Sequence, residues 1–288
     1  MIIEPRDSTQ LAATLKAAPL VLYGMGGASI HIAKWCDENK VNYVFADQDI
    51  RKRQTRVDKF VVSPERLRKD YPNANIVISS IIYYDEIENK LLSLGIDKKY
   101  ILSYELFIKE NVTWKDLEYK IPWGEHIGRV KMISEWVSDD AQSVADYGEG
   151  KLSLKNYINP GIIYYPIDYI KRSNETILCD FNNDEFPKLQ TDISVCTATL
   201  VFITKADSLL NYICKNTSRI IILSYVTIDI FSNIKGRRAS GYVNDFTQED
   251  IVNICLTHGF ILKEKRSDPA NKIDTLFLFE KTKVGENK

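Results

Sequence analysis

The chain has 288 residues, of which 44% are hydrophobic and 27% are charged, and its formal net charge is −1. This length suits two domains, each large enough to bury a core of its own. A net charge near zero gives no overall field that would draw the chain to nucleic acid or to an anionic membrane. We interpret the short basic runs at 51–56 and 235–238 as solvated loops rather than a nucleic-acid surface.

The five cysteines form no Cys-x-x-Cys pair, and most of them stand in apolar runs, where a free thiol behaves as a small buried hydrophobe. The three histidines lack ligand-like spacing, so no zinc or other metal site is predicted. The first ten residues show no signal-peptide pattern, and no apolar run approaches the ~18 residues of a membrane span. These features predict a reduced, cytoplasmic protein without a membrane span.

Strand and helix patterns alternate in the first third of the chain. Short apolar runs predict buried strands at 19–24, 41–47 and 75–80. Apolar residues at helical spacing predict helices at 28–40, 63–71 and 83–95. Such alternation is typical of parallel strands joined by helical crossovers. Mixed polar and aromatic residues without periodicity follow, and they predict a domain 1–108 and a linker 109–122.

The alternation starts again at residue 123. Apolar runs predict parallel strands at 143–146, 162–168, 176–180, 192–200 and 219–225. Helices are predicted at 125–137, 151–158, 205–216 and 246–259, with a loop that includes 235–238. The last two runs, 260–267 and 274–282, are joined by a polar turn and predict an antiparallel pair. The sequence thus predicts an α/β protein with two Rossmann-like domains in series, the second (123–288) containing a seven-stranded sheet.

The stretch from Asp146 to Gly150, Asp-Tyr-Gly-Glu-Gly, follows a predicted strand and precedes a predicted helix. Glycines at such a turn let a ligand approach the backbone, and a helix N-terminus offers free N–H groups. Asp168 ends the next strand 18 residues after Gly150, about where a carboxylate accepts the two hydroxyls of a ribose. Asp180 ends the third strand at the same edge. Three acids there favour a neutral or cationic nucleoside over a pyrophosphate.

These segments, with the terminal strand pair, resemble a class I S-adenosylmethionine-dependent methyltransferase over about residues 123–282. The resemblance implies S-adenosyl-L-methionine as the cofactor. It implies the cofactor-binding residues Asp146, Gly148, Gly150, Asp168, Asp180, Phe181 and Thr197. In this arrangement Asp168 would hold the ribose hydroxyls, while Asp180 and Phe181 would meet the adenine. Thr197 and Ala198 would lie near the sulfonium and the methyl acceptor.

The sequence departs from the methyltransferase pattern at three points. Leu152 stands at the third small position of the glycine loop. Only about seven residues separate Asp168 from the third strand, so the usual second helix is missing or minimal. The segment after the fourth strand lacks the Asn/Asp-Pro-Pro-Tyr/Phe motif, which argues against methylation of DNA bases. These departures leave open a methyltransferase-like binding or scaffold module that takes no cofactor.

Residues 18–105 resemble the small Rossmann domain that precedes sugar-modifying enzymes, similar to the N-terminal unit of PglD-type sugar N-acetyltransferases. The resemblance implies a nucleotide or nucleotide-sugar site formed by Gly24, Gly26, Gly27 and Asp47. Ser29 replaces the third glycine of the dinucleotide motif, which disfavours NAD chemistry; a nucleotide-sugar oxidoreductase remains an alternative. The other alternative is a docking or dimerisation domain whose glycine turn binds no ligand, which is compatible with a homodimer.

Methyl transfer from a sulfonium relies largely on positioning, and a base is needed mainly for a hydroxyl acceptor. The catalytic candidates are His126, before the first core strand, and Tyr225, at the end of the fifth. Arg129, Arg237 and Arg238 are candidates for binding a substrate phosphate or carboxylate. The two resemblances together imply a small-molecule acceptor, a sugar or nucleotide-sugar of surface-polysaccharide biosynthesis, and no nucleic-acid partner.

Overall fold

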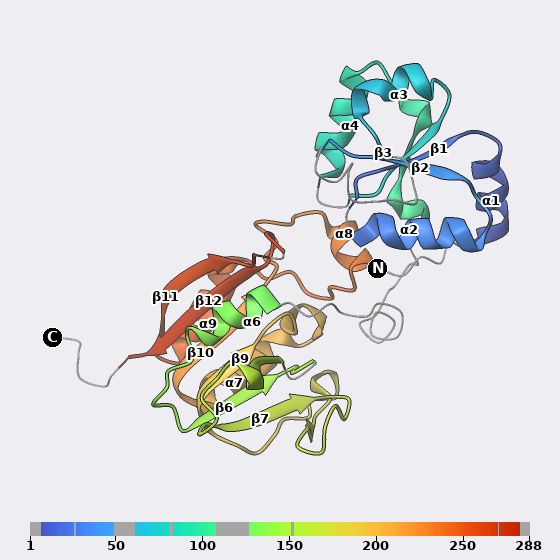
Figure 1. Cartoon of the computed structure of the whole chain (residues 1–288). Coiled ribbons are helices and arrows are strands. Elements are labelled where there is room, and N and C mark those ends of the chain that lie inside the picture. The colour runs from blue at the N-terminus through green and yellow to red at the C-terminus, as the bar shows by residue number, and fades with distance from the viewer. Residues whose placement is uncertain are drawn as a thin grey trace. The chain divides into compact units, whose positions relative to one another are not determined.

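The computed structural model describes residues 7–25, 27–48, 61–80, 83–107, 127–150, 153–269 and 271–282. The chain divides into two compact units (Figure 1): Met1–Pro122 with Ile234–Gly241, and Trp123–Asn233 with Tyr242–Lys288. The segment Ile234–Gly241 therefore groups with the first unit, although the sequence places it inside the second domain. Within the described ranges, no helix has the length and apolar character needed to cross a membrane.

The first unit contains a parallel sheet with strand order β3-β2-β1-β4-β5. Its strands are β1 (Leu20–Tyr23), β2 (Tyr43–Ala46), β3 (Val61–Val62), β4 (Asn75–Ile78) and β5 (Ile101–Ser103). Its helices before the linker are α1 (Ser8–Lys16), α2 (Gly27–Glu38), α3 (Pro64–Asp70) and α4 (Tyr84–Ser93), with 3-10 turns at Lys98–Tyr100 and Tyr104–Phe107. Helices cover both faces of this sheet (Figure 1), and each face has its own apolar core.

The second unit contains a seven-stranded sheet with the order β11-β12-β10-β9-β6-β7-β8. The parallel strands are β6 (Ser143–Tyr147), β7 (Ile163–Asp168), β8 (Ile177–Leu178), β9 (Thr191–Cys196) and β10 (Thr217–Tyr225). The antiparallel strands are β11 (Phe260–Ser267) and β12 (Thr275–Lys281). The predicted fold class, two Rossmann-like units with a terminal antiparallel pair in the second, is confirmed.

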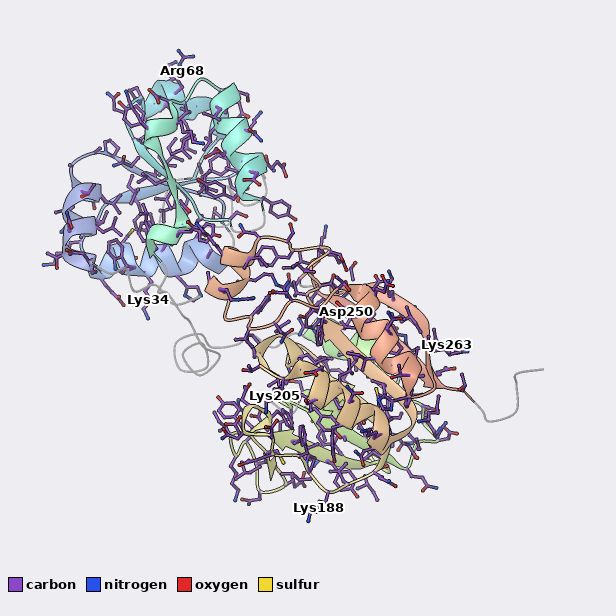
Figure 2. All side chains as sticks on the ribbon, turned by 180° about the vertical axis from the view of Figure 1, so that it is seen from behind. Lys34, Arg68, Lys188, Lys205, Asp250 and Lys263 are labelled. Carbon is purple, nitrogen blue, oxygen red and sulfur yellow. The ribbon has the colours of Figure 1, made fainter. Side chains whose placement is uncertain are left out.

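The helices of this half of the chain are α6 (Ile127–Ser134), α7 (Ala206–Asn216), α8 (Ile234–Ala239) and α9 (Gln248–Thr257), with 3-10 turns at Ser153–Asn156, Phe181–Asn183 and Leu200–Phe202. Local chemistry sets the ends of α9. Thr247 and Asp250 form a reciprocal capping box at its start. Gly259 follows its last turn with a left-handed φ of 77°. Charged side chains such as Lys263 point away from the packed layers (Figure 2).

Two local predictions are wrong. The predicted helix at 151–158 is absent, since the described residues there form only the 3-10 turn Ser153–Asn156. Pro160 disfavours helical backbone at Asn159, so a helix in this segment could not extend beyond residue 158. The predicted loop around 235–238 is the helix α8, and the Arg237 side chain is buried rather than solvated. The basic run at 51–56 lies outside the described residues.

Candidate cofactor site at the carboxyl edge of the second sheet

The glycine loop begins where β6 ends. Gly148 and Gly150 both adopt left-handed backbone, with φ of 81° and 56°. A Cβ at Gly148 would lie 2.0 Å from Thr199 Oγ1, so the packing of Thr199 alone requires glycine there. Apart from its chain neighbours, no atom of the described residues lies within 4 Å of a Cβ placed at Gly150. The loop thus turns against the protein at Gly148 and faces open space at Gly150.

Two predicted carboxylates lie beside this loop. Asp146, 5% exposed, accepts a hydrogen bond from the Tyr164 hydroxyl at 2.5 Å. Burial raises the pKa of Asp146 to about 6, with a further contribution from Asp168. Asp168, 4% exposed, accepts bonds from Ile170 N at 3.1 Å and from Arg172 Nε at 3.3 Å. Burial also raises the pKa of Asp168, although these donors oppose the shift.

Glu149 is a third buried carboxylate, and the sequence analysis did not select it. Its Oε1 accepts a hydrogen bond from Thr176 Oγ1 at 2.7 Å. Its Oε2 is buried and has no hydrogen-bond partner among the described residues. Burial raises the pKa of Glu149 to about 7, and Asp168 and Asp146 add to the shift. An acid between two glycines was the available signal, but the sequence does not show that its side chain turns inward.

Asp180 and Phe181, the predicted adenine residues, contact neighbouring protein groups. Asp180 accepts bonds from Asn182 N at 3.1 Å and Asn183 Nδ2 at 3.3 Å, and so caps the turn Phe181–Asn183. Phe181 is buried, with its ring centroid 6.0 Å from that of Tyr147 and 6.4 Å from that of Phe186. Their contact with adenine stays a prediction.

The segment after β9 has strained backbone. Ala198 has a φ of 53°, which side-chain-bearing residues rarely adopt. Its N–H donates to Ser224 Oγ at 2.9 Å, and Ser224 Oγ donates to Asp274 Oδ2 at 3.1 Å. Thr197, which precedes Ala198, is partly exposed, and its carbonyl accepts a bond from Thr199 Oγ1 at 3.1 Å. A short chain of hydrogen bonds therefore holds this segment against β10 and the start of β12.

Arg129 forms internal ion pairs. Its guanidinium is 2.5 Å from Asp268 Oδ2 and 2.9 Å from Asp274 Oδ2, and all three side chains are buried. Asp274 has a pKa raised to about 6, because burial and Asp268 outweigh the attraction of Arg129. A substrate phosphate could reach Arg129 only by displacing these carboxylates, so its predicted substrate role gains no support from the geometry.

The remaining candidates lie in different settings. Tyr225 is buried, and its hydroxyl donates to Asn244 Oδ1 and accepts from Phe246 N at 3.0 Å. Arg237 and Arg238 belong to α8, in the segment that groups with the first unit. The candidates His126 and Gly26, together with Leu152, lie outside the described residues.

The glycine turn of the first unit is held by two buried side chains. Gly24 has a left-handed φ of 97°. Asp47, at the end of β2, accepts a bond from Met25 N at 2.8 Å. Ser79, after β4, donates to the carbonyls of Tyr23 and Gly24 at 2.7 and 2.8 Å. Asp47 therefore orders the turn, whereas the sequence suggested it as a ligand contact. Gly27 begins α2.

No protein-family model and no curated protein sequence matches the chain. Among solved structures, the chain is similar to the magnesium protoporphyrin IX methyltransferase ChlM of Synechocystis PCC 6803 with bound SAH (16% identity, 60% of this chain and 90% of that one, TM-score 0.45). It is also similar to the pyocyanin biosynthetic protein PhzM (13% identity, 70% and 69%, TM-score 0.47). A third is CalO1, a methyltransferase in calicheamicin biosynthesis, in its SAH-bound form (12% identity, 70% and 61%, TM-score 0.44). Likenesses at this level carry no functional inference.

Proposed function

We propose that the second unit binds S-adenosylmethionine and transfers its methyl group to a small-molecule acceptor. The observation that carries this proposal is the glycine loop at the carboxyl edge of the sheet, where Gly150 faces open space beside the buried carboxylates of Asp146 and Asp168. The carboxyl ends of parallel strands are the usual ligand-binding edge of such sheets. The strand order, with the terminal antiparallel pair, is the one that the resemblance to class I methyltransferases leads us to expect.

The residues present fit this cofactor. Its sulfonium and amino group are cationic, and the carboxylates of Asp146, Glu149 and Asp168 favour positive charge nearby. Its ribose offers two hydroxyl donors, and Asp168 is an acceptor at the strand end next to the loop. Arg172, which is partly exposed, now bonds to one oxygen of Asp168, so the ribose would share this carboxylate with it. When bound, the cofactor supplies an electrophilic methyl group.

The chain's own residues would act mainly by positioning. The hydrogen bonds from Ala198 to Ser224 and from Ser224 to Asp274 fix the backbone after β9, where the resemblance places the acceptor. A fixed backbone there would hold an acceptor in line with the methyl group, which supplies much of the rate of such a displacement. We keep His126 and Tyr225 as candidates for orienting or deprotonating the acceptor; Tyr225 would first have to give up its bond to Asn244.

The acceptor class is the finer part of the proposal. We propose a sugar or nucleotide-sugar, because the first unit resembles the domain that precedes sugar-modifying enzymes. The glycine turn at Gly24, ordered by Asp47 and Ser79 at the carboxyl edge of its sheet, is compatible with a nucleotide site. The biosynthesis of surface polysaccharide is the setting that this resemblance implies.

A binding or scaffold module without a cofactor is the second candidate. Two observations favour it. Thr199 packs directly over Gly148, and Asp168 already has donors in Ile170 and Arg172. Thr199 and the two donors to Asp168 thus already make contacts that a bound cofactor would otherwise make. This candidate predicts a folded chain that binds no S-adenosyl compound.

Calorimetric titration of the full chain with S-adenosylmethionine and S-adenosylhomocysteine separates the two candidates. The matched variant is Gly150→Asn, because asparagine tolerates left-handed backbone and the new Cβ would have no atom within 4 Å from the part of the chain that the structure describes, its chain neighbours apart. Gly259→Asn is the control, since Gly259 is also left-handed but follows α9. We expect wild type and the control to bind and Gly150→Asn to lose at least about tenfold in affinity. A folded wild type that binds neither compound would overturn the enzyme proposal.

A further inference from the structure

The carboxylate cluster of Asp146, Glu149 and Asp168 carries more negative charge than the groups bonded to it neutralise. Each of the three side chains is at least nine-tenths buried. Within the described residues, the hydrogen-bond donors to Asp146 and Glu149 are neutral hydroxyls, those of Tyr164 and Thr176. Arg172 bonds to Asp168. With every group ionised, the cluster and Arg172 sum to −2, from three negative charges and one positive charge.

Among the three carboxylates, Glu149 is the one whose charge changes most readily near neutral pH, because of the groups around it. Asp168, Asp146, Arg172 and the Thr176 hydroxyl act on it electrostatically, and the Tyr164 phenol lies within range of its charge. Its Oε2 has no hydrogen-bond partner among the described residues, although it is buried. A buried carboxylate oxygen without a donor is costly when ionised, so a proton on Glu149 or a cation bound beside this oxygen would stabilise the site.

We propose that the cluster of Asp146, Glu149 and Asp168 makes the glycine loop selective for a cationic ligand, a sulfonium, over the uncharged thioether of the same molecule. This inference rests on the proposed function for the location of the ligand. It goes further in assigning to Glu149 a role in distinguishing the charged cofactor from its product. Loss of the methyl group removes the sulfonium charge, and the site then releases the thioether more readily.

Selective binding of a cation at this cluster is linked to the loss of a proton from Glu149. Binding of a cation near Glu149 favours its ionised form and drives off the proton that an empty or thioether-bound site retains. The pKa of Glu149 is raised to about 7 by burial and by its acidic neighbours, so the carboxyl is partly protonated near neutral pH. Binding of the sulfonium compound at pH 7 should release up to about half a proton, and binding of the thioether less, because only the amino group of the thioether is cationic.

The test is calorimetry of the full chain with S-adenosylmethionine and S-adenosylhomocysteine in two buffers of different ionisation enthalpy. For wild type we expect tighter binding of the sulfonium, by about tenfold at pH 8, and a ratio that shrinks toward pH 6 as the cluster gains protons. Proton release should be larger for the sulfonium compound than for the thioether. Glu149→Gln keeps an oxygen for the Thr176 hydroxyl but has no charge, so it should lose the proton release and most of the preference.

The outcomes separate this inference from the proposed function. If wild type binds both compounds with equal affinity and equal proton release at every pH, charge selectivity is wrong while cofactor binding stands. If folded wild type binds neither, the proposed function itself fails, and this inference fails with it. The wild-type pH series needs no variant, so a Glu149→Gln chain that does not fold leaves the test intact. Retention of the full preference by a folded Glu149→Gln chain would overturn the role of Glu149.

Discussion

Substitution of Gly148 by alanine should destabilise the second unit far more than the same change at Gly150. Both glycines have left-handed φ, so each alanine incurs about 1–2 kcal/mol of backbone strain. At Gly148 the new Cβ would also lie 2.0 Å from Thr199 Oγ1 and 2.9 Å from both Thr199 Cβ and Cγ2. Overpacking of this kind costs about 1–3 kcal/mol. At Gly150 the new Cβ would meet no described atom within 4 Å beyond its chain neighbours, so only the strain is counted.

We therefore expect Gly148→Ala to lose about 2–5 kcal/mol and Gly150→Ala about 1–2 kcal/mol of unfolding free energy. Urea unfolding gives the total, and hydrogen exchange of β6 and β9 amides assigns the loss to the second unit. Thr199→Gly removes the clashing atoms and should restore about 2 kcal/mol in a double-mutant cycle with Gly148→Ala. Equal losses for the two alanine variants, or a cycle without coupling, would refute the reasoning.

Three further predictions concern stability, each measured by urea unfolding of the full chain. The pKa of Glu149 is raised from 4.5 to about 7 in the folded chain. The contribution of Glu149 to the free energy of unfolding is therefore fully present below pH 4.5 and is lost as the pH rises through 7. Glu149→Gln should remove this loss of roughly 3 kcal/mol. The same pH dependence of the unfolding free energy in wild type and in Glu149→Gln would contradict this prediction. Arg129→Met removes the cation that the buried carboxylates of Asp268 and Asp274 share and should cost about 3–5 kcal/mol. Asp274→Asn keeps the acceptor for Ser224 and should cost less at pH 8; the reverse order would contradict the ion-pair account. Thr247→Ala breaks the capping box of α9 and should cost about 1 kcal/mol, unlike a substitution at a solvated helix position, which should cost almost nothing.

Strand and helix alternation was predictable because each strand core is a short apolar run and several ends have local signals. The left-handed Gly95 after α4 and the capping box at Thr247 are examples. Apolar spacing predicts a helix at 151–158, but the spacing of apolar residues does not distinguish an α-helix from the 3-10 turn Ser153–Asn156 that forms there. The basic run at 235–238 predicts a solvated loop, whereas the structure has the helix α8 there with Arg237 buried, and the sequence does not show this burial.

The candidate site was predictable only in part. Strand ends in a parallel sheet share one edge, so Asp146 and Asp168 could be placed there from sequence alone. The partners of these residues could not be placed. Arg129 pairs with Asp268, which is 139 residues away in the chain, and Ser224 bonds to Asp274, which is 50 residues away. Spacing along the chain carries no information about such contacts, and the same limit hid the inward turn of Glu149.

Hydrogen exchange of the full chain, with and without S-adenosylmethionine, tests the central claim most directly. The account predicts added protection of backbone amides in the glycine loop after β6 and at the ends of β7 and β8. Protection should be absent from the turn at Gly24 in the first unit. Protection at that turn without any change at residues 146–150, or no change anywhere in a folded chain, would contradict a cofactor site in the second unit.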